Sequence, residues 1–331
     1  MMKMQSVLVL GAGSWGTALA LVLARKKHIV YLWDIDIELI KSLKTERTNI
    51  RYIPGVPFPK NIVPVESIDQ VPLETKIFVN SVPCHGLRSS LQLLKSFSEV
   101  HLCVACKGFE PGTQKFNHRV VEEELPKSAI AILSGPSFAK EVGAGLPTAV
   151  TIAAKDIAVA KIFADLFHDD VFRIYTHGDV IGTQVGGAVK NVMAIAAGIA
   201  DGLGFGANTR SALLTRGLAE IMRLGLAMGA RQETFMGLAG LGDLVLTCTD
   251  NQSRNRSLGL LLAEGLSVNA ASEKIGQAIE GLRTANEVAV LAKKHGIEMP
   301  IIEQVNNVLQ SKCSPAEAVK NLLARDSKAE V

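Results

Sequence analysis

The sequence has few aromatic residues, few cysteines and little excess of charge. Aromatic residues make up 5% of its 331 residues and charged residues 20%, whereas 48% are hydrophobic. This composition excludes a disordered chain and favours folded domains, two of them at this length. A formal net charge of only +3 gives no sign of a nucleic-acid-binding surface, so we expect no nucleic-acid partner.

The five cysteines do not form a metal-binding pattern. Cys103 and Cys106 make one C-x-x-C, but they lie in an apolar, strand-like run where residues three apart point to opposite faces. No second such pair and no H-E-x-x-H completes a site. We therefore expect no metal, and structural thiols in a reducing compartment.

Long apolar runs are also missing. The apolar run directly before Gly11 has only four residues, Val7–Leu10, and the run Val192–Ala200 is bounded by Lys190-Asn191 and Asp201. Neither is long enough for a signal-peptide core or a membrane span, so we expect a cytoplasmic protein without membrane insertion.

The first half of the chain alternates β-branched runs with helix-period segments, which predicts a doubly wound, Rossmann-like parallel sheet covered by helices on both faces. The predicted strands are Val7–Leu10, Val30–Asp34, Ile77–Asn80, His101–Cys106, Ala129–Leu133, Thr148–Ala153 and Val171–Thr176, and the helices between them include Thr17–Lys27, Gly86–Phe97 and Thr113–Glu124.

The second half is rich in Ala, Leu and Gly and reads as helices throughout. The predicted helices are 180–200, 208–228, 231–237, 241–249, 253–264, 267–276, 281–295, 300–310 and 315–324. Ser314-Pro-Ala-Glu317 has the pattern of a capped helix start. The predicted architecture is therefore an α/β dinucleotide-binding domain over 1–178 and an all-helical substrate domain over 179–331.

Gly11, Gly13 and Gly16 form a G-x-G-x-x-G that follows the first strand and opens a helix. These glycines allow a tight turn, close approach of a pyrophosphate and close packing of helix on strand, which predicts dinucleotide binding. Asp34 ends the second strand, where a carboxylate accepts hydrogen bonds from the adenosine ribose. No Arg or Lys lies at 33–37, which favours NAD over NADP. An ordinary turn aspartate is the alternative for Asp34, and we expect Asp36 to be solvated.

Polar residues follow two later strands, at the edge of a parallel sheet where ligands bind. Lys107 comes after the fourth strand, and Ser134-Gly135-Pro136-Ser137 after the fifth. We expect them to face the cofactor, although a solvated lysine and a plain connection are the alternatives.

Lys190 lies inside an almost wholly apolar helix. A buried ammonium is costly unless it is paired, and burial penalises its charged form, so such a lysine can donate and accept a proton. A lysine that extends to solvent is the alternative.

Asp243 and Thr247 are four residues apart and share one helix face, and Ser253-Arg254-Asn255 looks like a helix start suited to a phosphate dianion. A polar helix start with a solvated arginine is the alternative. Together, a dinucleotide, two lysines, a carboxylate and a phosphate clamp indicate reduction of a phosphorylated carbonyl compound.

Over nearly its whole length the chain resembles the NAD(P)-dependent glycerol-3-phosphate dehydrogenases of the bacterial biosynthetic type. The matching segments are Gly11–Ala20, Lys107-Gly108, Ser134–Ala139, Gly186–Asn191, Gly206–Arg210, Gly240–Thr249 and Ser253–Arg256. The resemblance implies interconversion of dihydroxyacetone phosphate and sn-glycerol 3-phosphate for glycerophospholipid synthesis, by a cytoplasmic homodimer.

The resemblance also implies residue roles. Lys190 is the proton donor and acceptor, Lys107 touches substrate and cofactor, and Asp243 and Thr247 complete the catalytic set. The implied substrate-binding residues are Lys107, Gly135, Ser137, Lys190, Asn191, Asp243, Ser253, Arg254 and Asn255. The implied cofactor contacts, besides the glycines, Asp34 and Lys107, are Ser14, Trp15, Ala139, Arg254, Ala278 and Glu280.

One departure concerns the cofactor. Many members of this type carry a basic residue or His just after the second strand and accept NADPH, whereas this chain has Trp33-Asp-Ile-Asp36. We therefore expect NAD or NADP as cofactor, with a preference for NADH.

Two other functions are compatible with these patterns: a related Lys-Asn dehydrogenase of the 6-phosphogluconate or ketopantoate type, and a nonenzymatic NAD-binding sensor. The first predicts turnover of a longer or branched substrate. The second predicts that Lys107 and Lys190 can be lost without consequence.

Overall fold

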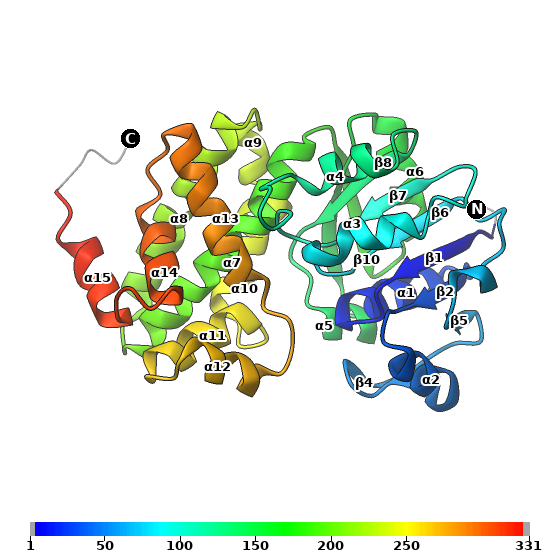
Figure 1. Cartoon of the computed structure of the whole chain (residues 1–331), viewed down its shortest axis with the longest axis horizontal. Helices are drawn as coiled ribbons and strands as arrows, with labels where there is room; N and C mark the ends of the chain where they lie inside the picture. The colour runs from blue at the N-terminus through cyan, green and yellow to red at the C-terminus, as the bar shows by residue number, and fades with distance from the viewer. Residues whose placement is uncertain (1–3, 327–331) are drawn as a thin grey trace. The chain divides into compact units, whose positions relative to one another are not determined.

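The computed structural model describes residues 4–326, which divide into two compact units (Figure 1). Of the described residues, unit 1 comprises 4–110 and 115–184, and unit 2 comprises 111–114 and 185–326. The boundary predicted at 178/179 remains a prediction.

Unit 1 is built on an eight-stranded sheet with the order β10-β9-β8-β7-β6-β1-β2-β5. Every pairing in it is parallel except that of β8 with β9. The strands are β1 (Ser6–Leu10), β2 (Ile29–Trp33), β5 (Ile62–Val65), β6 (Ile77–Asn80), β7 (His101–Val104), β8 (Ala129–Ser134), β9 (Thr148–Ala153) and β10 (Phe172–His177).

Helices cover both faces of this sheet (Figure 1), and two separate apolar cores result. One core contains Leu19 of α1 and Phe163 of α6, and the other contains Leu87 of α3 and Val120 of α4. Cys103 lies in the first core and Cys106 in the second, so the C-x-x-C is split across the sheet as predicted, and both thiols are free. The helices are α1 (Ser14–Arg25), α2 (Ile37–Glu46), η1 (Ile68–Gln70), α3 (Cys84–Gln92), α4 (Asn117–Glu124), α5 (Ala139–Ala144) and α6 (Ile157–Phe167).

Three local predictions for unit 1 were incomplete or wrong. The edge strand β5 and the small pair β3 (Thr48–Asn49) and β4 (Ile53–Pro57) were not predicted. The sheet is not wholly parallel, because β9 runs against β8. Helix α4 begins only at Asn117, since Phe109 and Phe116 pair as an antiparallel bridge before it.

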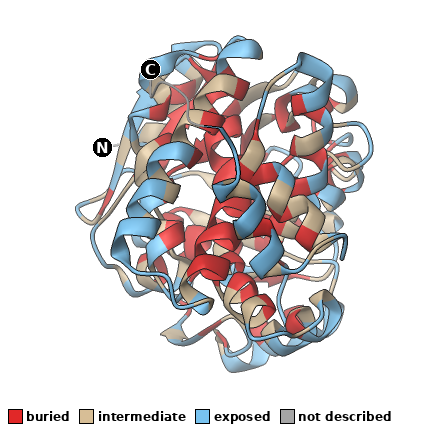
Figure 2. Cartoon of the chain, turned by 90° about the vertical axis from the view of Figure 1, so that its left-hand side faces the viewer, coloured by how far each residue is buried: buried red, intermediate tan, exposed pale blue. Residues whose placement is uncertain are grey.

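Unit 2 consists of helices, as predicted. Figure 2, which looks onto these helices, shows that many have one buried and one exposed side. They are α7 (Val180–Gly202, which begins in unit 1), α8 (Ala207–Ala227), α9 (Gln232–Phe235), the π-helical turn η2 (Leu238–Gly242), α10 (Asp243–Thr249), α11 (Arg254–Ala263), α12 (Val268–Ile275), α13 (Glu280–His295), α14 (Pro300–Leu309) and α15 (Pro315–Leu323).

Helix α7 is the central element of unit 2. Among the described residues it alone is long and apolar enough to cross a membrane, but 94% of its apolar window is buried inside the protein, as in the core helix of a globular fold. The α15 start is confirmed as a capping box, in which the Ser314 side chain caps the backbone N–H of Glu317.

Candidate active site

The glycine loop lies between β1 and α1, at the point where the strand order of the sheet reverses. Ligands of doubly wound folds bind at this point, beyond the carboxyl ends of the strands. Gly11 has a positive φ of 96°, and a Cβ on Gly16 would lie 1.8 Å from the carbonyl oxygen of Gly11. Both positions therefore require glycine.

The loop leaves room for a pyrophosphate. A Cβ on Gly13 would meet no atom within 4 Å, and no side chain caps the start of α1 at Ser14. The indole Nε1 of Trp15 is buried without a hydrogen-bond partner. Because free N–H groups at a helix N-terminus favour an anion, these residues fit a dinucleotide.

Two residues that the sequence analysis missed hold this loop in place. The Asn49 side chain donates to the carbonyl of Ala12 at 2.9 Å, and the Ser81 hydroxyl donates to the carbonyl of Gly11 at 2.9 Å. Ser81 directly follows β6, so its place at a strand end was the available signal. Asn49 comes from β3, a strand that no pattern indicated.

Asp34 lies immediately after β2, and backbone groups hold its carboxylate. Oδ2 accepts from the N–H of Ala12 at 2.6 Å and Oδ1 from the N–H of Asp36 at 3.0 Å. The prediction that Asp36 is merely solvated was wrong, because it caps α2 at Leu39 and pairs with Arg51 at 3.0 Å.

The two polar clusters at the other strand ends are in contact. Lys107 Nζ donates to the carbonyl of Gly135 at 3.0 Å, and the Ser137 hydroxyl donates to the same oxygen at 3.0 Å. Adjacent parallel strands β7 and β8 bring these residues to one edge of the sheet. Lys107 is only partly buried, and Ala139 follows as the first residue of α5.

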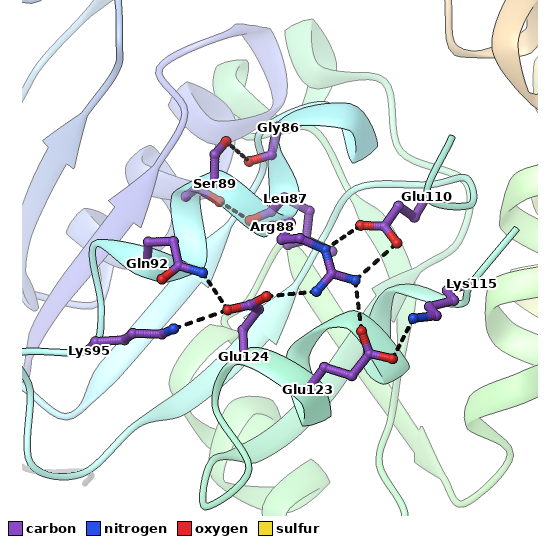
Figure 3. Close-up of polar contacts among 11 residues, drawn as sticks. Gly86, Leu87, Arg88, Ser89, Gln92, Lys95, Glu110, Lys115, Glu123 and Glu124 are labelled. Carbon is purple, nitrogen blue, oxygen red and sulfur yellow. Dashed lines mark hydrogen bonds and ion pairs between the residues drawn. The ribbon is translucent and has the colours of Figure 1, made fainter. Parts of the chain in front are cut away.

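The segment after Lys107 is held by Arg88 of α3 (Figure 3). Its guanidinium donates twice to Glu110, at 2.7 and 3.0 Å, and also to Glu123 and Glu124 of α4. Such a bidentate pair fixes direction as well as distance. It therefore fixes the chain three residues beyond Lys107.

In unit 2, Lys190 is buried and paired rather than extended to solvent. Its Nζ lies 2.5 Å from Asp243 Oδ1 and 2.8 Å from Thr247 Oγ1, and the Asp243 side chain is only 1% exposed. Thr247 also donates to the Asp243 carbonyl at 2.6 Å, a contact that a spacing of four residues in a helix allows.

Small residues make this pairing possible. A Cβ on Gly186 would lie 2.4 Å from the carbonyl oxygen of Ala239, and a Cβ on Gly240 would lie 2.2 Å from that of Phe235. Helix α7 thus packs backbone to backbone against the π turn that leads into Asp243. The sequence did not indicate this turn, a form often found at functional sites.

A hydrogen bond between side-chain amides connects the start of α11 to α7. Asn255 Nδ2 donates to Asn191 Oδ1 at 3.0 Å, and Asn255 Oδ1 accepts from the N–H of Gly281 at 2.9 Å.

Ser253 is buried and caps α11, whereas Arg254 is exposed and its Nη1 lies 3.4 Å from Gln277 Oε1. Ala278 is exposed nearby in sequence. Burial raises the pKa of Glu280, the first residue of α13.

The comparisons with known proteins decide the family. Residues 6–160 match the N-terminal domain, and residues 179–320 the C-terminal domain, described as NAD-dependent glycerol-3-phosphate dehydrogenase. The chain belongs to this family. It is therefore an oxidoreductase that uses NAD or NADP, and the sensor alternative is wrong.

Curated relatives and solved structures agree with this. The chain is 52% identical to glycerol-3-phosphate dehydrogenase [NAD(P)+] of Nitrosococcus oceani, over 98% of this chain and 95% of that protein. The Thioalkalivibrio sulfidiphilus protein of the same name is also 52% identical, over 99% of this chain and its whole length. The Coxiella burnetii glycerol-3-phosphate dehydrogenase structure superposes with a TM-score of 0.94 at 44% identity, covering 97% of this chain and 99% of that one.

Proposed function

We propose that the chain interconverts dihydroxyacetone phosphate and sn-glycerol 3-phosphate, with Lys190 as the group that moves the proton. The buried contact of Lys190 with Asp243 and Thr247 carries this proposal. A nicotinamide cofactor held at the glycine loop would supply or accept the hydride. Reduction leaves negative charge on the former carbonyl oxygen, and an ammonium beside it stabilises that charge and donates the proton.

The surrounding residues have supporting roles in this proposal. Asp243 keeps Lys190 Nζ in one position, and Lys107 binds substrate and cofactor together with Gly135 and Ser137. Arg254 and Asn255, with Asn191 and Ser253 beside them, bind the substrate phosphate at the start of α11. Ser14, Trp15, Ala139, Ala278 and Glu280 contact the cofactor.

The reaction itself tests this assignment. With dihydroxyacetone phosphate and reduced cofactor, the absorbance of the reduced nicotinamide should fall, and sn-glycerol 3-phosphate should form in equal amount. Turnover of 6-phosphogluconate or ketopantoate without turnover of dihydroxyacetone phosphate would instead favour the related dehydrogenases.

The cofactor preference gives a second prediction. Because Asp34 is held by backbone N–H groups, its negative charge opposes a 2′-phosphate at the ribose. At a partly solvated position the repulsion between the carboxylate and the 2′-phosphate costs about 1–2 kcal/mol. The kcat/KM should therefore favour NADH over NADPH by roughly 5- to 30-fold. The double variant Asp34→Gly/Ile35→Arg should shift the ratio toward NADPH.

Lys41, Arg47 and Arg51 are cationic side chains that could bind a 2′-phosphate and so reduce the preference for NADH. Lys41 contacts Glu38 and Arg47 donates to backbone carbonyls, but Arg51 lies beside Asp36. Arg51→Met is therefore the control variant for a cation that could offset the charge of Asp34. It should leave the NADH kinetics unchanged. Equal use of both cofactors by the wild type, with no shift in the double variant, would show that Asp34 is only a turn residue.

We also infer the cellular setting of the reaction from the resemblance. It supports a cytoplasmic homodimer that acts on a small phosphorylated substrate and supplies glycerophospholipid synthesis. Sedimentation of the purified protein tests the dimer, since a monomer at micromolar concentration contradicts it.

A further inference from the structure

Arg256 is a buried arginine directly after the proposed phosphate-binding residues Arg254 and Asn255. Its side chain is 9% exposed, and its Nη2 lies 2.6 Å from Oδ2 of Asp201, a carboxylate that is 8% exposed. Its Nη1 also donates to the side chain of Asn251. Its backbone N–H donates to the Ser253 hydroxyl at 3.2 Å. Side chain and backbone together thus tie Arg256 to the turn that precedes α11.

Asp201 lies near the end of α7, the helix that also carries Lys190. Its other oxygen, Oδ1, accepts from Nε and Nη2 of Arg210 on α8, at 3.0 and 2.7 Å. Two arginines therefore share one carboxylate, which leaves a net positive charge. Arg210 belongs to the Gly206–Arg210 segment, to which the proposed mechanism assigns no role, and its side chain is 34% exposed.

Helices α7 and α11 cross in close contact at two glycines, Gly198 and Gly259, with no side chain of either glycine between them. A Cβ on Gly198 would lie 2.1 Å from the carbonyl oxygen of Arg256, and one on Gly259 would lie 2.2 Å from that of Ile195. The Asn191–Asn255 hydrogen bond holds the same pair of helices. A glycine crossing alone permits sliding and rotation, whereas directional polar contacts do not.

We propose that Arg256, held by Asp201, is a positioning residue: it fixes the first turn of α11 against α7, and thereby the phosphate-binding residues relative to Lys190. This rests on the proposed function of Arg254 and Asn255. A buried ion pair is weak evidence for a gain in stability, because well-packed apolar residues often replace it at no cost. Placement of a bound substrate, in contrast, is sensitive to shifts of about 1 Å.

The test compares Arg256→Met with the double variant Arg256→Met/Asp201→Leu. The single variant leaves a buried carboxylate that has lost one partner, so it can lose stability. The double variant removes both charges and should fold. For both proteins we expect the KM for dihydroxyacetone phosphate to rise about 10- to 30-fold, with kcat changed less than about threefold. Dissociation constants for the reduced cofactor should stay within about twofold of the wild type.

Two controls separate positioning from a general loss of structure. Arg210→Met removes the other arginine from Asp201 without touching α11, and it should raise that KM by less than about threefold. The kcat/KM for unphosphorylated dihydroxyacetone should stay unchanged in the Arg256 variants, because this ketone has no phosphate to misplace.

An unchanged KM for dihydroxyacetone phosphate in the double variant overturns the positioning role. An equal loss of kcat/KM for dihydroxyacetone phosphate and dihydroxyacetone in the Arg256 variants overturns it too. If Arg254→Ala raises the KM while the Arg256 variants do not, the proposed function stands and only this inference fails. If the wild type does not reduce dihydroxyacetone phosphate, the proposed function itself fails.

Discussion

Replacing Lys190 with methionine should lower kcat for dihydroxyacetone phosphate reduction by about 10²- to 10⁴-fold, the usual contribution of a positioned general acid. Methionine keeps most of the side-chain volume but removes the ammonium next to Asp243 and Thr247. Cofactor binding, measured by titration of nicotinamide fluorescence, should be nearly unchanged. Retention of more than about a tenth of the wild-type kcat contradicts a proton-transfer role for Lys190.

Folding must be controlled in this experiment, because Asp243 is 1% exposed and loses its partner in the variant. An unpaired buried charge costs about 3–5 kcal/mol. The double variant Lys190→Met/Asp243→Asn avoids that charge, so it should fold better than the single variant and remain equally inactive. Lys161→Met, at a solvent-exposed lysine paired within α6, is the surface control and should keep full activity.

Replacing Arg254 with alanine should raise the KM for dihydroxyacetone phosphate by about 30- to 150-fold, the effect of losing one charge-assisted contact of about 2–3 kcal/mol. Arg254 is exposed at the first turn of α11, and the start of a helix favours an anion. The kcat at saturation should fall much less, because Lys190 is intact.

Unphosphorylated dihydroxyacetone distinguishes a phosphate contact from a general defect. Its kcat/KM should change much less than that of the phosphorylated ketone, although a contact of Arg254 with the cofactor would reduce the contrast. Arg325→Ala, at a surface arginine of the same unit paired with Glu298, should change neither value. Equal losses for both ketones in Arg254→Ala count against a phosphate clamp.

Sequence patterns predicted the order and type of most elements, because those depend on neighbours along the chain. The predicted strand Ile77–Asn80 is β6, and Thr148–Ala153 is β9. Periodicity did not reveal β5 or the antiparallel pairing of β9, since pairing depends on which strands become neighbours in the sheet. The π turn before Asp243 packs against α7, which is distant from it in sequence, and periodicity did not reveal it either.

The sequence by itself determined the residue types of the site: three glycines after a first strand, a lysine in an apolar helix, and Asp243 and Thr247 on one helix face. Each lies in a short segment whose local pattern predicts its role. Only the tertiary structure decided which of these groups meet. Lys190 contacts Asp243 across 53 positions of chain and Arg256 contacts Asp201 across 55, and no local pattern encodes such pairs. Their contacts follow from close helix packing at glycines such as Gly186 and Gly198, where a side chain would separate the helices.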